Sequence, residues 1–212
     1  MVKHLNKAAK YDKKNSAAEL GFRGRMRERL LGGLCGDVLE LGAGTGANFS
    51  HYSPCARVTA IEPDRVMLER ASTKLASLAC ASITLQECDA AQLPFADRSF
   101  DAVVATLVLC SVSDLEATLR EVLRVLKPNG ELRFMEHVRG NGLRGAIQDL
   151  VSPVWAHVGA GCRPNRRTPQ ALRRMGFRVE SIEERASLGV TSPIVSGIAR
   201  RATLPETTSG QA

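Results

Sequence analysis

The sequence of 212 residues predicts an α/β fold, with a mostly parallel β-sheet covered by helices on both faces. Three observations lead to this prediction. Short apolar runs alternate with amphipathic stretches between residues 37 and 138. The run at 102–110 is apolar almost throughout, as in strands buried on both faces. Two strand-like segments then close the chain without a helical pattern between them.

The expected elements follow in chain order. Residues 3–14 form a basic arm, mobile or helical, and residues 16–31 form a helix that ends at Gly32 and Gly33. Strands are expected at 37–42, 58–62, 82–88, 100–109 and 131–138. Helices are expected at 64–78, at 115–126 after Asp114 as N-cap, and from about residue 168. Residues 127–130 form a turn, and 176–185 and 192–201 pair as an antiparallel hairpin at a sheet edge.

This order predicts one domain over residues 1–202, followed by a disordered tail at 203–212. Residues 1–31 are its N-terminal arm and helix. Residues 139–167, rich in glycine and arginine, are expected as an insertion above the carboxyl ends of the strands, where open α/β sheets bind ligands.

The first strand leads into a loop with glycine at every second position, in "VLELGAGTGAN" (38–48). Such a loop lets the backbone approach a nucleotide-like ligand, and the pattern alone permits a dinucleotide. Glu62, at the end of the second strand, is placed to accept hydrogen bonds from ribose hydroxyls. Asp89, after the third strand, can accept from an adenine amine. A Walker-type lysine motif is missing, so the loop favours one adenosine rather than a nucleoside triphosphate.

These residues resemble the class I S-adenosylmethionine-dependent methyltransferases of the small-molecule type. "VLELGAGTG", "VTAIEPD", "ECDAAQLPFADRSFDAVVA" and "LREVLRVLKPNGELRFMEH" match the family's motifs over residues 37–138. The resemblance implies a Rossmann-like fold of seven strands, the final one antiparallel, and S-adenosyl-L-methionine as cofactor. It implies these cofactor-binding residues: Tyr11, Glu40, Gly42, Ala43, Gly44, Thr45, Gly46, Asn48, Glu62, Pro63, Met67, Asp89, Ala90, Thr106 and Leu107.

Two further stretches, 106–114 and 135–177, resemble methyltransferase-like proteins that methylate alkyl thiols. The resemblance implies a small thiol as methyl acceptor, and a thiol needs little help from a base because a few per cent of it is already thiolate at neutral pH. His137, at the end of the fifth strand, is the candidate to deprotonate or orient the acceptor. The expected substrate-binding residues are Cys110, Trp155, His157 and Cys162.

Composition bounds the remaining possibilities. No apolar run approaches the ~20 residues that span a bilayer, and no signal peptide is visible, so a cytoplasmic protein without stable membrane insertion is expected, a monomer or homodimer. The six cysteines form no C-x-x-C pair, which predicts buried small side chains, no disulfide and no metal. The net charge is +7, with eight arginines and one acid between 139 and 178, and this segment is expected as a solvated basic face.

Other functions stay open from the sequence. An O- or C-methyltransferase of a quinone, phenol or polyketide would share every cofactor motif. A nucleic-acid methyltransferase would fit the positive charge, although "ATLVLC" stands where such enzymes carry Asn/Asp-Pro-Pro-Tyr, so no nucleic-acid partner is expected. A cofactor-binding protein without catalysis and a dehydrogenase are the remaining alternatives.

Overall fold

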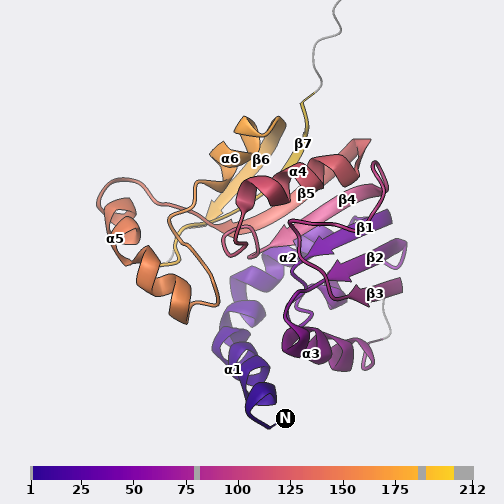
Figure 1. Ribbon diagram of the computed structural model, residues 1–212, viewed down its shortest axis with the longest axis horizontal. Helices are drawn as coiled ribbons and strands as arrows, with labels where there is room; N and C mark the ends of the chain where they lie inside the picture. Colours follow the sequence, from indigo (N-terminus) through magenta and orange to yellow (C-terminus); the bar gives the residue numbers. More distant parts are fainter. Residues whose placement is uncertain (1, 79–81, 186–189, 203–212) are drawn as a thin grey trace, which may run out of the picture.

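Seven strands form a single sheet in the order β3-β2-β1-β4-β5-β7-β6 (Figure 1), in a computed structural model that describes residues 2–78, 82–185 and 190–202. β7 runs antiparallel to β5 and β6, and the pairs from β3 to β5 are parallel, as the sequence predicts. The strands are β1 (Gly36–Leu41), β2 (Ala56–Ile61), β3 (Ser82–Gln86), β4 (Phe100–Thr106), β5 (Leu126–His137), β6 (Phe177–Arg185) and β7 (Ile194–Arg201). The predicted tail at 203–212 lies outside the described residues.

Helices cover both faces of this sheet, which the alternation of side chains along the strands explains. Leu39 and Leu41 of β1 belong to a core with the helices α4 and α6, whereas Val38 belongs to a core with α2 and α3. The helices are α1 (Val2–Ala18), α2 (Gly24–Leu31), α3 (Arg65–Leu75), α4 (Leu115–Val125), α5 (Gly142–Val158) and α6 (Thr168–Arg174). Asp114 caps α4 as predicted, because its carboxylate accepts from Ala117 N at 2.9 Å.

Two predicted boundaries along β4 and β5 are wrong. β4 ends at Thr106 rather than residue 109, because Leu107 turns into the left-handed region with φ 59°. The expected turn at 127–130 lies within β5. Phe100 of β4 pairs with Leu126 of β5, and Ala102 pairs with Glu131, so β5 has the extra residues of a bulge in this interval. The shortened β4 leaves residues 107–110 free to form a loop at the end of the sheet.

The N-terminal region is helical and continues along the edge of the domain. α1 and α2 are joined by the π-helical turn η1 (Glu19–Arg23), and Gly21 in it has non-helical backbone angles that kink the chain. Asp12 of α1 pairs with Arg70 of α3 at 3.0 Å, which ties the arm to the domain. Four apolar side chains of the predicted helix at 16–31 differ in burial: Met26 and Leu30 are buried, whereas Ala17 and Leu20 are exposed.

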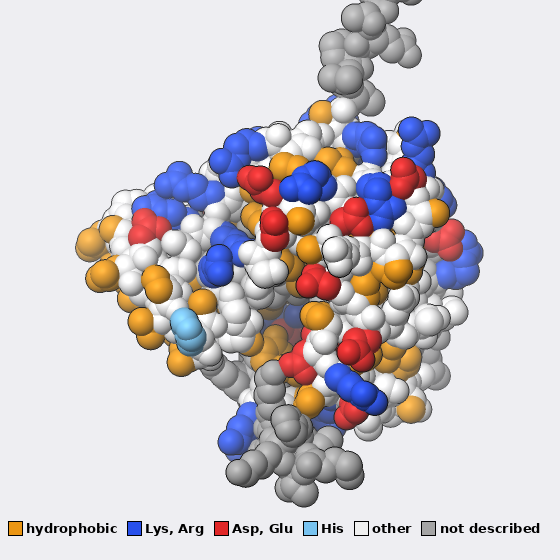
Figure 2. Space-filling model, viewed as in Figure 1, with side chains coloured by type: hydrophobic (Ala, Val, Ile, Leu, Met, Phe, Trp, Pro, Cys, Tyr) orange, Lys and Arg blue, Asp and Glu red, His pale blue; other side chains and the backbone are white. Residues whose placement is uncertain are grey.

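α5 fills most of the predicted insertion at 139–167, for which the sequence indicated no helix. One face of α5 exposes large apolar side chains, seen at the left of Figure 2, and these are Leu143, Ile147, Leu150, Val154 and Val158. The opposite face is held to the sheet by the buried Gln148, which accepts from Gly140 N at 2.6 Å and donates to four backbone carbonyls. Within the described ranges, no helix is both long and apolar enough to cross a membrane.

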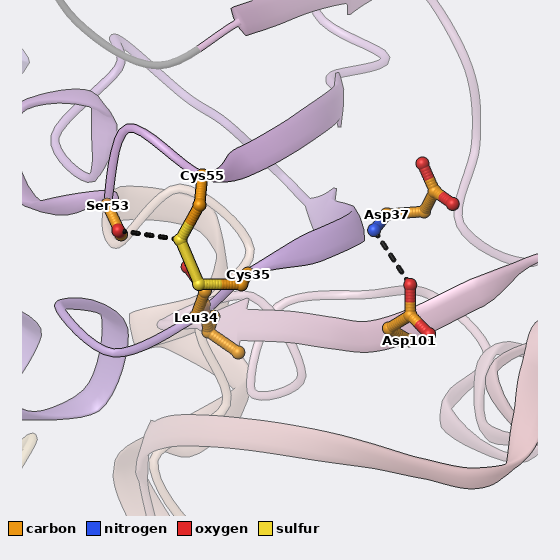
Figure 3. The surroundings of a disulfide bond; sticks show 6 residues. All are labelled: Leu34, Cys35, Asp37, Ser53, Cys55 and Asp101. Carbon is orange, nitrogen blue, oxygen red and sulfur yellow. Dashed lines mark hydrogen bonds between the residues drawn. A yellow bond between two sulfur atoms is a disulfide. The ribbon is translucent and has the colours of Figure 1, made fainter.

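A disulfide between Cys35 and Cys55 contradicts the prediction of six separate buried cysteines (Figure 3). β1 and β2 start side by side, with Gly36 opposite Ala56, so the two cysteines that precede these strands are brought together by the sheet. Both are exposed. Closing a loop of this size stabilises the fold by about 3 kcal/mol. Cys88 is partly buried, Cys110 and Cys162 are buried and free, and Cys80 lies outside the described residues.

Candidate active site

A cavity of about 700 Å³ lies at the carboxyl ends of β1, β2, β4 and β5, as expected for an open α/β sheet. α1 and α5 supply two of its walls, and Figure 2 shows the molecule hollowed on this face. Its volume suits a cofactor together with a small acceptor. Most of the predicted site residues line it: Tyr11, Glu40, Gly42, Ala43, Gly44, Thr45, Asn48, Glu62, Pro63, Met67, Thr106, Leu107, Cys110, His137, Trp155, His157 and Cys162.

The three loop glycines have left-handed backbones but serve different purposes. A Cβ atom on Gly42 would lie 2.5 Å from Val108 Cγ2, and one on Gly46 would lie 2.5 Å from the Phe49 ring. Both glycines therefore allow the loop to pack against the domain. A Cβ atom on Gly44 would meet no atom closer than 4.0 Å, and Gly44 is the glycine whose free side opens into the cavity.

Glu62 joins the glycine loop to the end of β2. Its Oε2 accepts from Gly44 N at 2.9 Å, and its Oε1 accepts from Asp64 N at 3.0 Å. The residue is 9% exposed, and a carboxylate oxygen can accept more than one hydrogen bond, so the side chain can also take hydroxyl donors from the cavity. Asp64 in turn caps α3 by accepting from Val66 N and Met67 N.

A buried polar network forms the floor of the cavity beside the loop. The Glu40 carboxylate accepts from Asn48 Nδ2 and from the Tyr52 hydroxyl, both at 2.9 Å. The Arg27 guanidinium donates to Asn48 Oδ1 at 2.5 Å and to Thr106 Oγ1 at 2.7 Å. Burial raises the pKa of Glu40 to about 7, so part of this carboxyl is protonated near neutral pH.

Arg27 is the residue of this network that the sequence analysis missed. It is 4% exposed and pairs with Glu19 at 2.8 Å. The available signal was its position on the helix, because Leu30 and Leu31 follow it at helical spacing and mark the buried face of α2. An arginine on such a face requires polar partners inside the domain.

Three predicted cofactor residues do not line the cavity. Gly46 packs against Phe49 behind the loop, as described above. Asp89 follows β3 with its side chain exposed, and its Oδ1 accepts from Ala91 N at 2.8 Å. Ala90 is buried in the core that includes α4. The structure thus gathers the residues after β1 and β2 at the cavity and leaves the segment after β3 outside its lining.

The other end of the cavity is lined by Cys110, His137 and Cys162, all three buried. His137 Nδ1 lies 3.7 Å from Cys110 Sγ and 3.5 Å from Cys162 Sγ. The hydrogen bond with Cys162 and, after it, burial raise the pKa of the Cys110 thiol to about 12. The same hydrogen bond lowers the pKa of the Cys162 thiol. Trp155 and the exposed His157 of α5 line this end too.

Backbone contacts between two loops bring these three side chains together. The buried Glu136, next to His137, accepts from the backbone N–H groups of Val108, Leu109 and Cys110 at 3.0, 2.8 and 3.0 Å. Arg163 N donates to Cys110 O at 2.8 Å, which joins the loop after β4 to the loop after α5.

Arg166 adds a second connection between the same loops, since its guanidinium donates to the carbonyls of Leu109 and Val112. From the sequence, Arg166 is expected on a solvated basic face, and no role is predicted for Glu136. Neither role carries a local sequence signal, because the partners are main-chain atoms of segments far apart in the chain. Arg139 likewise pairs with Asp149 at 2.8 Å, so some arginines of the basic segment at 139–178 form contacts within the domain.

The residues present fit S-adenosylmethionine. Gly44 leaves room for a ligand above the loop, Glu62 presents a carboxylate to hydroxyl donors, and Glu40 places a buried carboxyl where a cationic methionine part would lie. A seven-stranded sheet in this order, with β7 antiparallel to its neighbours, defines the Rossmann-like methyltransferase class.

Comparisons with known proteins agree with this class. A family model described as a methyltransferase domain matches residues 39–134. The chain is 36% identical to the human thiol S-methyltransferase TMT1A, over 76% of this chain and 69% of that protein. It is 37% identical to TMT1B of Rattus norvegicus, over 69% of this chain and 62% of that protein. The chain belongs to the S-adenosylmethionine-dependent methyltransferases, and its cofactor is S-adenosyl-L-methionine.

Two further relatives show the range of the family. The quinone C-methyltransferase UbiE of Desulfotalea psychrophila is 40% identical over 58% of this chain and 52% of its own. The N-methyltransferase NodS of Bradyrhizobium japonicum, solved with S-adenosyl-L-homocysteine, shares the fold with a TM-score of 0.65 and 18% identity, over 87% of this chain and 86% of that one. The chain spans less than two thirds of the rat thiol methyltransferase, and relatives differ in the atom they methylate.

Proposed function

We propose that this protein transfers the methyl group of S-adenosylmethionine to the sulfur of a small organic thiol. The observation that carries the proposal is the lining of one cavity, which includes both the glycine loop and the buried Cys110, His137 and Cys162. The similarity to TMT1A and TMT1B, named as thiol S-methyltransferases, supports the same acceptor.

The cofactor supplies an electrophilic methyl group on a sulfonium. The chain then has to hold the acceptor sulfur about 3–3.5 Å from that carbon and in line with the bond that breaks. Leu107, with its left-handed backbone, and Val108 line the cavity between the two ends, and Trp155 contributes an apolar wall. We assign the cofactor end to the predicted residues that line the cavity and the acceptor end to Cys110, Trp155, His157 and Cys162.

His137 is the side chain proposed to orient or deprotonate the acceptor. It stands at the end of β5, and its Nε2 atom is buried with no hydrogen-bond partner among the described residues. An imidazole nitrogen in this state can accept a proton from a thiol or donate to the resulting thiolate, depending on its tautomer. A thiol makes a modest demand on such a group because its pKa is near 8.5.

The test is a methylation screen that pairs the purified protein with alkyl thiols, phenols, quinols and amines, read by product mass. We expect a methyl thioether from at least one thiol. His137→Gln should lower turnover on that thiol at least about tenfold. His51→Gln, outside the cavity lining, is the matched control and should keep wild-type turnover. Turnover on a phenol or quinol without any methylated thiol would overturn the proposal in favour of an O- or C-methyltransferase.

A further inference from the structure

We propose that Cys110, His137 and Cys162 bind a zinc-type metal ion whose open coordination position receives the acceptor thiol. This inference rests on the proposed thiol acceptor and deepens it, because it gives the acceptor end of the cavity a specific means of activating sulfur. The sequence contains no C-x-x-C spacing that would indicate this site. The three ligands come from the loop after β4, the end of β5 and the loop after α5.

The geometry of the three ligand atoms matches a tetrahedral metal. Zn–S bonds of about 2.3 Å and Zn–N bonds of about 2.0–2.1 Å place a nitrogen and a sulfur ligand about 3.6 Å apart at a tetrahedral angle. His137 Nδ1 lies 3.7 Å from Cys110 Sγ and 3.5 Å from Cys162 Sγ, and all three ligand atoms lie within 4.8 Å of one another. One nitrogen facing two sulfurs is the arrangement that a shared ion requires.

The type of ligand selects the metal. Two thiols and one imidazole form a soft to borderline set that favours zinc over magnesium or calcium, which prefer oxygen. Three protein ligands with a fourth position open are the pattern of catalytic zinc sites, whereas structural sites use four. All three residues line the cavity, so the fourth position faces the space in which the acceptor would lie.

The surrounding chain holds the ligands in place before any ion arrives. Glu136 fixes the backbone N–H of Cys110 at 3.0 Å, and Arg163 N fixes the Cys110 carbonyl at 2.8 Å. Cys162 N donates to Gly159 O at 3.1 Å, and His137 is fixed in the sheet opposite Ile194 of β7. Such outer contacts orient the ligands of metal sites.

The reaction then balances without a separate base. The acceptor thiol binds at the open position and releases its proton to water, because coordination to a cation stabilises the thiolate. A lone pair of the acceptor sulfur forms the new bond to the methyl carbon. The bond from that carbon to the cofactor sulfonium breaks, its electron pair stays on sulfur, and S-adenosylhomocysteine and a methyl thioether leave. Of the two roles proposed for His137, this scheme keeps the orienting one: His137 positions the acceptor as a ligand of the ion through Nδ1 and does not deprotonate it.

The closing experiment measures metal binding by itself. Metal-free full-length protein is titrated with Zn²⁺, and separately with Co²⁺, whose thiolate charge-transfer and tetrahedral ligand-field bands report sulfur ligands. We expect one equivalent of tightly bound ion in the wild type. We expect at least a tenfold loss of affinity in Cys110→Ser and in Cys162→Ser. Cys88→Ser is the matched control, because this free cysteine lies outside the cavity, and it should bind like the wild type.

The result has clear ways to fail. A wild type that binds neither ion, cobalt bands unchanged in both serine variants, or a Cys110–Cys162 disulfide found by peptide mapping of the purified protein would each overturn the site. The wild-type cobalt spectrum alone decides the matter if a serine variant does not fold. Methylation of a thiol at an unchanged rate by metal-free protein would overturn the catalytic role but leave the proposed function standing. Tight zinc binding without methylation of any thiol would overturn the proposed function and the catalytic role of the ion, and leave only the metal site standing.

Discussion

The two ends of the cavity are built in opposite ways. The cofactor end comes from short consecutive motifs, a glycine loop after β1 and an acid at the end of β2, which act through their own backbone geometry. The acceptor end comes from side chains of three separated segments that meet through backbone contacts of Glu136, Arg163 and Arg166. A glycine loop and an acid at a strand end can thus be recognised from neighbouring residues, whereas the contacts that bring Cys110, His137 and Cys162 together join segments far apart in the chain.

The largest expected effect tests whether the cofactor end depends on Arg27, a residue of α2 outside the glycine loop and the strand ends. Arg27→Met removes the cation that holds Asn48 and Thr106 from α2, and leaves Glu19 with only the longer pair to Arg23, at 3.9 Å. Breaking a buried network of this kind should lower the free energy of unfolding by about 3–5 kcal/mol. Denaturant unfolding measures the loss. Arg29→Met, which removes an exposed pair with Glu183, should cost below about 1 kcal/mol; equal losses would contradict the role of Arg27.

The next effect concerns pH at the cofactor end. The folded-state pKa of Glu40 is raised from 4.5 to about 7 by burial, so the folded protein holds this proton more tightly than the unfolded chain. The contribution to stability is present below about pH 4.5 and is lost as pH rises to about 7, by up to about 3 kcal/mol. Urea unfolding from pH 4 to 8 should show this slope, and Glu40→Gln should reduce it, leaving the share of the buried Glu136, whose pKa burial also raises.

Cofactor affinity should have the opposite dependence on pH. S-adenosylmethionine carries positive charge, so it binds the ionised form of Glu40 better and its affinity should rise as pH increases through about 7. Calorimetric titration from pH 5 to 8 measures this. An affinity that does not change with pH in the wild type would remove Glu40 from the cofactor site.

Leucine substitutions at two glycines separate the effect of backbone strain on stability from the effect on cofactor affinity. Gly44 and Gly142 have nearly the same left-handed φ, 56° and 55°, and open space beside them, but only Gly44 lines the cavity. Leucine at either position should cost about 1–2 kcal/mol of stability. Gly44→Leu alone should weaken cofactor binding, by about 100-fold or 2.7 kcal/mol. Equal affinity in both variants, measured by calorimetry, would place the cofactor elsewhere.

The last change tests whether the acceptor end can be altered without affecting the cofactor end. Gln148→Leu leaves Gly140 N and several carbonyls without their buried partner on α5, and should lower stability by about 1–3 kcal/mol. Turnover on a thiol should fall while cofactor affinity stays unchanged. Leu150→Gln, at an exposed site of the same helix, is the control and should affect neither. Loss of cofactor binding in Gln148→Leu would show that the two ends are coupled.

The sequence predicted the fold well, for physical reasons. Strand alternation and the capping Asp114 depend on neighbours in the chain, and these predictions are confirmed. α5 was missed because Gly145 and Pro153 within it weigh against a helix, although its exposed apolar side chains recur at helical spacing. The disulfide was missed because Cys35 and Cys55 meet only once β1 and β2 pair.

The assignment of individual site residues is more mixed. Glu62 lines the cavity and accepts from the loop, whereas the exposed Asp89 accepts from Ala91 N and is not part of the cavity lining. Both were inferred from the same kind of position, the end of a parallel strand. The sequence does not record how far each side chain turns toward the ligand, because that depends on the loop that follows the strand.

The disulfide and the buried thiol pair place two opposite chemical demands on one domain. Cys35 and Cys55 lie in solvent at the amino ends of their strands, where the surrounding redox buffer reaches them. Cys110 and Cys162, at the carboxyl ends of the sheet, are 1% and 6% exposed and have to stay as thiols to serve any role in the cavity. The length of the strands therefore separates the two pairs, so that oxidation can stabilise the amino end of β1 and β2 while the buried cysteines at the carboxyl end stay reduced.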